Sequence, residues 1–181
     1  MDSSNQLRMM VYASLFAALT AVGAFLAIPI GPVPIVLQNM FVYLAGLLLG
    51  GRWGLASVGV YLLAGACGLP VFAGGLGGIG RFIGPTGGYL IGYLPTVLLI
   101  GRISQRTQPR MLFDVLAMIC GTLVLYACGV SWLKIVTAMP PAKALALGMY
   151  PFLIGDALKI AAAAAIAKAL RPVLRTETSG D

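Results

Sequence analysis

The chain has 181 residues, of which 60% are hydrophobic and only 9% are charged, and its formal net charge is +7. Soluble domains carry about 25% charged residues, so this composition excludes a soluble domain and indicates an integral membrane protein. The basic residues stand singly between apolar runs and form no stripe, which argues against nucleic-acid binding.

Six apolar segments are predicted to be transmembrane helices of a single all-α domain covering residues 1–181. At about 20 residues for each span plus short connections, the length suits five or six spans. Three of the segments are short for a full span, which predicts tilt or local thinning of the bilayer. In chain order the six segments are residues 8–28, 36–50, 53–67, 87–101, 111–130 and 150–170.

The distribution of lysine and arginine predicts the orientation of the chain. If the amino terminus is cytoplasmic, only Arg81, Lys134 and Lys143 lie on the outer side. The cytoplasmic side then holds eight basic residues, which are Arg8, Arg52, Arg102, Arg106, Arg110, Lys168, Arg171 and Arg175. By the positive-inside rule, both termini are expected in the cytoplasm, with the protein in the cell membrane.

The outer connections are predicted to be long loops at residues 28–34, 68–88 and 131–149. They are apolar, hardly charged and rich in glycine and proline. Loops of this length in a compact domain are usually functional. Their apolar composition predicts that they fold back onto the helices, as a lid over an outward-facing pocket.

Several kinds of chemistry are excluded by residues that the chain lacks. It has no histidine, which removes the commonest general base and metal ligand, and its three cysteines show no C-x-x-C spacing. No Gly-Lys dipeptide occurs, so the chain cannot bind ATP through a P-loop. We therefore expect no metal, no cofactor and no enzymatic activity. A lipid-modifying membrane enzyme is the alternative, although it would require clustered acids or a histidine.

Two charged residues stand inside the last apolar segment. Asp156 and Lys159 are three residues apart, so their side chains share one helix face. Ionised groups at membrane depth are costly and usually mark a ligand or ion site. We expect this pair to bind the ligand, and a structural ion pair is the alternative.

Other polar residues near the outer side are candidates for the same site. Arg81 is suited to a bidentate contact with a ligand carboxylate, and a solvated loop charge is its alternative. The hydroxyl groups of Thr86 and Tyr89 are further hydrogen-bonding candidates.

Small residues recur every fourth position in the first segment, at Ala13, Ala17 and Ala21. Such a stripe lets two helices approach closely. It predicts either internal packing or a docking face for another membrane protein.

Taken together, several stretches resemble the BioY family, the biotin-specific substrate-binding (S) components of energy-coupling-factor (ECF) transporters. They occur in the family's order across nearly the whole chain. They are Pro32-Val33-Pro34 with Leu37-Gln38, the run from Gly68 to Gly75 that contains Phe72, the run from Gly84 to Leu90, and Gly155-Asp156-Ala157-Leu158-Lys159.

The resemblance implies a six-helix membrane protein that captures biotin from outside, with Asp156 and Lys159 lining the pocket. It also implies docking through Ala13 and Ala17 to a transmembrane coupling subunit, with two ATPase subunits completing the complex. Another vitamin is the alternative ligand, and the oligomeric state is left open. Gln38, Phe72, Thr86, Tyr89 and Arg81 complete the predicted binding residues. Biotin's ureido N–H groups suit the Asp156 carboxylate, and aromatic rings suit its apolar body.

Overall fold

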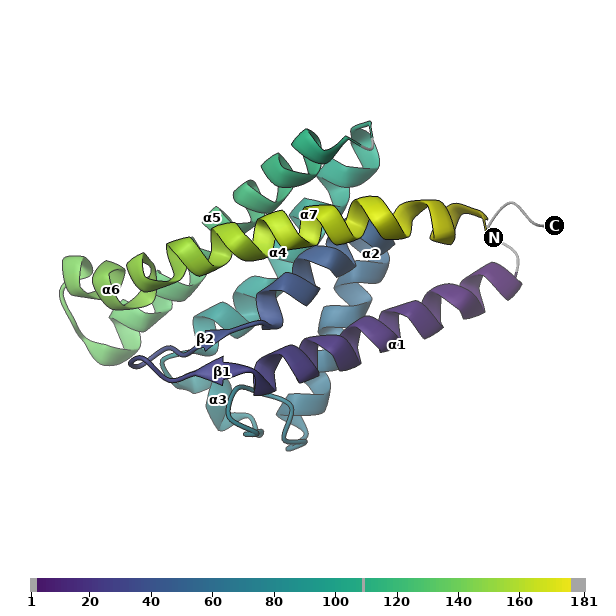
Figure 1. Cartoon of the computed structure of the whole chain (residues 1–181). Helices are drawn as coiled ribbons and strands as arrows, with labels where there is room; N and C mark the ends of the chain where they lie inside the picture. The colour runs from purple at the N-terminus through teal and green to yellow at the C-terminus, as the bar shows by residue number, and fades with distance from the viewer. Residues whose placement is uncertain (1–2, 109, 177–181) are drawn as a thin grey trace.

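The computed structural model describes residues 3–108 and 110–176, and most of them lie in helices (Figure 1). A two-stranded antiparallel hairpin pairs Ala27 with Val36 and Ile28 with Ile35. In chain order the elements are α1 (Ser3–Phe25), β1 (Ala27–Ile28), β2 (Ile35–Val36), α2 (Gln38–Ala66), α3 (Gly80–Ile83), α4 (Gly87–Arg106), α5 (Met111–Thr137), α6 (Pro141–Gly148), the 3-10 helix η1 (Tyr150–Phe152) and α7 (Leu153–Thr176).

The long helix α2 is interrupted at Gly50, which matches the predicted division between residues 36–50 and 53–67. Gly50 has φ of 77° and ψ of −176°, a backbone conformation that glycine adopts at little cost. A Cβ built on Gly54 would lie 3.2 Å from the carbonyl oxygen of Ala45. In a straight helix, residues nine positions apart are separated by about 13.5 Å. The two halves of α2 therefore fold back against each other.

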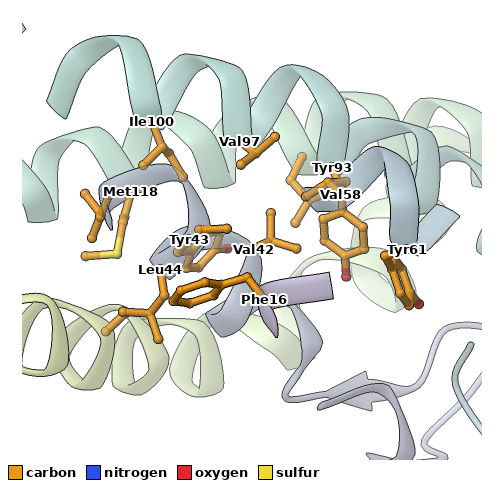
Figure 2. Close-up of a cluster of buried hydrophobic side chains, with 14 of the residues drawn as sticks. Phe16, Val42, Tyr43, Leu44, Val58, Tyr61, Tyr93, Val97, Ile100 and Met118 are labelled. Atoms are coloured by element: carbon orange, nitrogen blue, oxygen red, sulfur yellow. The ribbon is translucent and has the colours of Figure 1, made fainter. Parts of the chain in front are cut away.

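The core lies where α1, both halves of α2, α4 and α5 meet (Figure 2). α2 packs against α1 and α4, α4 packs against α5, and α7 closes the bundle against α2 and α5. The buried side chains labelled in Figure 2 include three tyrosines and are Phe16, Val42, Tyr43, Leu44, Val58, Tyr61, Tyr93, Val97, Ile100 and Met118.

The outside of the bundle is apolar as well. Large hydrophobic side chains such as Leu15, Val22, Leu123 and Leu158 are more than half exposed. Three of the described helices, α1, α2 and α5, are long and apolar enough to cross a membrane. An apolar surface of this extent suits contact with lipid rather than water.

Glycines allow the close approach of the helices. A Cβ built on Gly101 of α4 would collide with the backbone of Gly50 and Gly51 in α2. We therefore expect Gly101→Ala to lower the free energy of unfolding by about 3 kcal/mol, because two backbones would have to separate. Thermal unfolding of the purified protein in detergent measures this effect.

Gly59→Ala is the matched control, because a Cβ built on Gly59 has no neighbour within 4 Å. It is expected to leave stability unchanged or to raise it by up to about 1 kcal/mol through helix propensity. If Gly101→Ala and Gly59→Ala lowered the free energy of unfolding equally, this explanation of the packing at Gly101 would be wrong.

The prediction that residues 131–149 form a long outer loop was wrong. α5 continues to Thr137, and α6 occupies residues 141–148. Ala138 ends α5 in a left-handed conformation with φ of 52°, and Pro141 then occupies a first-turn position of α6, where its missing N–H costs nothing.

The predicted small-residue stripe on α1 packs mainly inside the chain. Ala13 and Ala17 are only 4% and 7% exposed, and the half-buried Ala21 packs against the same core. This arrangement favours internal packing, one of the two alternatives for the stripe. A docking role for these residues stays a prediction.

The beginning of α1 and the end of α7 lie at one end of the bundle, and the β-hairpin, α3 and α6 lie toward the other (Figure 1). Near the first of these ends, Arg171 of α7 donates to both carboxylate oxygens of Asp114 in α5, each at 2.7 Å. Its Nη2 also donates to Ser104 Oγ, and Ser104 in turn donates to the carbonyl of Leu47 in α2. A single polar network thus joins four helices.

Candidate ligand-binding site

A cavity of about 370 Å³ is lined by residues of the β-hairpin and of α2, α3, α4, α5 and α7. Two of the three predicted outer connections form part of its wall, through residues 29–34 and 72–76, while residues 131–149 contribute none of the lining. All of the residues predicted to bind a ligand line this one cavity, namely Gln38, Phe72, Arg81, Thr86, Tyr89, Asp156 and Lys159.

Asp156 is the polar centre of the cavity wall and is 4% exposed. Its Oδ1 accepts hydrogen bonds from Lys159 Nζ at 3.0 Å and from Asn39 Nδ2 at 2.8 Å. Its Oδ2 accepts a hydrogen bond from the Tyr126 hydroxyl at 2.5 Å. Donors from α2, α5 and α7 therefore meet at one carboxylate, which is the arrangement that a buried charge requires.

The local sequence explains why Asp156 occupies this position. Pro151 lies in η1 and leads directly into α7 at Leu153. Asp156 is in the first turn of α7, where the helix dipole stabilises a negative charge. Lys159 is one turn further along and reaches back to the carboxylate, and only 8% of it is exposed.

The aromatic side of the cavity is built around Phe72. Its ring packs edge to face against Tyr61 at a centroid distance of 5.5 Å and against Phe82 at 5.6 Å. The contact with α2 depends on Gly65, because a Cβ built there would collide with the Phe72 ring. Phe72 is thereby held in place as an apolar wall.

The remaining predicted residues take different positions around the cavity. Arg81 is half-buried on the short helix α3. Thr86 precedes α4 and makes no side-chain capping bond. Tyr89 donates its hydroxyl proton to the carbonyl of Gly148 at 2.6 Å, so that group can offer a ligand only its oxygen.

Sequence reasoning missed Asn39 and Tyr126, although both hold Asp156. A signal for Asn39 was present, because Gln38-Asn39 is a pair of amide side chains at the start of an apolar segment. Tyr126 carried no comparable signal, since it is one of seven tyrosines in the chain.

Comparison with known proteins places this arrangement in a family. The BioY family matches residues 1–176. A protein of Pyrococcus horikoshii named probable biotin transporter BioY is 44% identical over 158 residues, which cover 87% of this chain and 93% of that protein. The biotin transporter BioY of Thermotoga maritima is 38% identical over 165 residues, covering 91% of this chain and 96% of that protein.

A solved structure agrees with the sequence relatives. The crystal structure of the S-component for biotin from an ECF-type ABC transporter superposes with a TM-score of 0.88 at 34% sequence identity, and 95% of each chain is covered. The match over almost the whole length, at these levels of identity, shows that the chain belongs to the BioY family.

Proposed function

We propose that this protein binds biotin and acts as the substrate-binding S component of an ECF-type transporter. The observation that carries the proposal is a buried carboxylate, Asp156, held by three hydrogen bonds in the wall of a largely apolar cavity. Its relatives are named biotin transporters, and the superposed structure is an S-component for biotin. These similarities indicate a transporter component rather than an enzyme.

The lining of the cavity suits the chemistry of biotin. The ureido group of biotin has two N–H donors and a carbonyl, which suit Asp156 and Lys159. Its apolar rings suit the wall formed by Phe72, and its carboxylate suits the guanidinium of Arg81. A few placed polar groups in an apolar cavity are typical of small-molecule sites.

The proposal includes six spans with both termini in the cytoplasm. α1, the two halves of α2, α4, α5 and α7 correspond to the six predicted segments. The three basic residues expected outside, Arg81, Lys134 and Lys143, lie in α3, at the end of α5 and in α6. The cavity then opens to the outside of the cell, where an uptake protein meets its substrate.

Energy for uptake is proposed to come from other subunits, because the chain has no P-loop. The proposed partners are a transmembrane coupling subunit and two ATPase subunits. Contact through α1 would include its exposed face, where Ser14 and Ala18 lie next in sequence to the predicted docking residues Ala13 and Ala17.

Binding of labelled biotin to the purified protein tests the proposal. We expect saturable binding that unlabelled biotin displaces and that riboflavin and thiamine do not. Lys159→Ala is expected to weaken binding roughly tenfold, the equivalent of one hydrogen bond to a charged group. Failure of the parent protein to bind biotin would overturn the proposal, and displacement by another vitamin would reassign the ligand.

A further inference from the structure

Trp132 holds one wall of the cavity from outside and does not line the cavity itself. Its half-buried side chain lies in the last two turns of α5, and its indole Nε1–H donates to the carbonyl oxygen of Gly84 at 3.0 Å. Gly84 ends the short helix α3 and begins the connection to α4. The backbone N–H of Gly87 donates to the same oxygen at 3.0 Å, so both acceptor positions of this carbonyl are used.

The start of α4 fits closely against Trp132 because two glycines stand there. A Cβ built on Gly88 would collide with the Cβ of Trp132 and would lie 2.7 Å from the carbonyl oxygen of Cys128. A Cβ built on Gly87 would lie 2.9 Å from the indole Nε1 and would collide with the carbonyl oxygen of Phe82. The glycines that follow α3 therefore let the chain pack directly against this part of α5.

The segment that Trp132 holds carries two cavity-lining residues. Arg81 in α3 and Thr86 just before α4 line the cavity on either side of Gly84. α3 has only four residues, and none of them is buried. Within the part of the chain that the structure describes, the bond from Trp132 is the only side-chain hydrogen bond to residues 80–86.

α3 has few other contacts that fix its position. The Phe82 ring packs edge to face against Phe72 at a centroid distance of 5.6 Å and holds one side of α3. The carboxyl end of α3 is followed by Gly84, and glycine has access to many backbone conformations. The bond from Trp132 removes this freedom at that end. A binding group that is already held in its bound position loses less freedom when the ligand arrives, which favours binding.

We infer that Trp132 is a positioning residue that, through the Gly84 carbonyl, keeps the Arg81 guanidinium where it pairs with the carboxylate of the ligand. This inference rests on the proposed function, in which that carboxylate belongs to biotin. An arginine–carboxylate pair is directional, because two N–H groups face two oxygens, so it is sensitive to a displacement of α3. The polar contacts of Asp156 come from α2, α5 and α7 and do not depend on this bond.

The experiment compares biotin with biotinamide, whose tail is neutral, and measures the affinity of each for the purified protein. The parent is expected to bind biotin at least roughly tenfold more tightly, because the amide lacks the charge-assisted hydrogen bonds to Arg81. Trp132→Phe removes the indole N–H and keeps an aromatic ring. It is expected to bind biotin roughly tenfold more weakly than the parent and biotinamide within about twofold, which removes most of the preference.

Trp53→Phe is the matched control, because it makes the same change at the other tryptophan of the chain, which does not line the cavity. It should keep the preference of the parent for biotin. If Trp132→Phe does not fold, replacing the Trp132 indole with its benzothiophene isostere removes the N–H at nearly the same shape and carries the same comparison.

A double-mutant cycle tests whether Trp132 acts through Arg81. Arg81→Gln is expected to abolish the preference for biotin over biotinamide. Adding Trp132→Phe to Arg81→Gln should then change biotin affinity by less than about twofold, because the contact that Trp132 supports is already lost. If the two losses of biotin affinity multiplied, the residues would act independently and the inference would be wrong.

The remaining outcomes separate this inference from the proposed function. If the parent does not bind biotin, the proposed function fails. If the parent binds biotin and biotinamide equally well, biotin binding stands and this inference fails. If Trp132→Phe weakens both ligands by the same factor, or keeps the full preference for biotin, Trp132 has only a structural role and the inference fails as well.

Discussion

Asp156→Asn is expected to reduce biotin affinity by roughly 100-fold or more, because a charged acceptor at the centre of the cavity becomes a neutral amide. The change also leaves the Lys159 ammonium, 3.0 Å away, without its partner in a buried position. Breaking a buried ion pair on one side typically costs about 3–5 kcal/mol of stability. Binding of labelled biotin and thermal unfolding without ligand measure the two effects separately.

The matched control for this variant is Asp114→Asn, the same chemical change at the other buried carboxylate. It lies outside the cavity lining and should leave biotin affinity within about threefold of the parent once the protein is folded, because distant sites act independently. If Asp156→Asn bound biotin as tightly as the parent does, the polar centre of the site would have to lie elsewhere in the cavity.

Arg171→Ala is expected to give the largest loss of stability without loss of binding. Two hydrogen bonds of 2.7 Å join the guanidinium to Asp114, whose side chain is only 3% exposed. Removing the arginine leaves this buried carboxylate without its ionic partner, which lowers the free energy of unfolding by about 3–5 kcal/mol. For a chain of this size we expect a fall in Tm on the order of 10 °C. Thermal unfolding in detergent, with and without biotin, measures it.

Arg171→Lys separates charge from geometry at the same position. Lysine keeps the positive charge but cannot form the two parallel bonds to Asp114 together with the bond to Ser104. Its Tm is expected to fall between those of the parent and Arg171→Ala. If Arg171→Lys were as unstable as Arg171→Ala, the two parallel hydrogen bonds of the guanidinium, and not its charge, would supply the stability.

The sequence predicted the long helices, and it singled out Asp156 and Lys159 as candidates, because both depend on strong local signals. Apolar runs separated by glycine, proline and arginine located the six segments, and the break at Gly50 lies between two of them. Asp156 and Lys159 stood out because charge is rare in an apolar helix. Their placement in one cavity with Gln38, Phe72 and Arg81 agrees with the predicted grouping, and their contacts with a ligand stay a prediction.

Two parts of the structure depend on contacts that one sequence does not reveal. The sequence predicts a loop at residues 131–149 because the outer connections are hardly charged and rich in glycine and proline, yet Pro141 lies in the first turn of α6. Asn39 was missed because its role comes from Asp156, a residue 117 positions away in the sequence. Proline in a first turn is a local signal for a helix start, although it occurs in loops as well. A long-range amide contact has no distinctive local pattern.

The ionic contacts of α7 have a consequence for how the chain enters the bilayer. This helix carries Asp156, Lys159 and Arg171, and it is not among the described helices that are apolar enough to cross a membrane by composition. Asp156 and Lys159 pair with each other within α7. The further hydrogen-bonding partners of Asp156 and Arg171, from Asn39, Ser104, Asp114 and Tyr126, precede α7 in the chain. During synthesis they are made first. In the proposed six-span arrangement, α7 would then enter a bilayer that already holds these hydrogen-bonding partners, which lowers the cost of inserting charged residues.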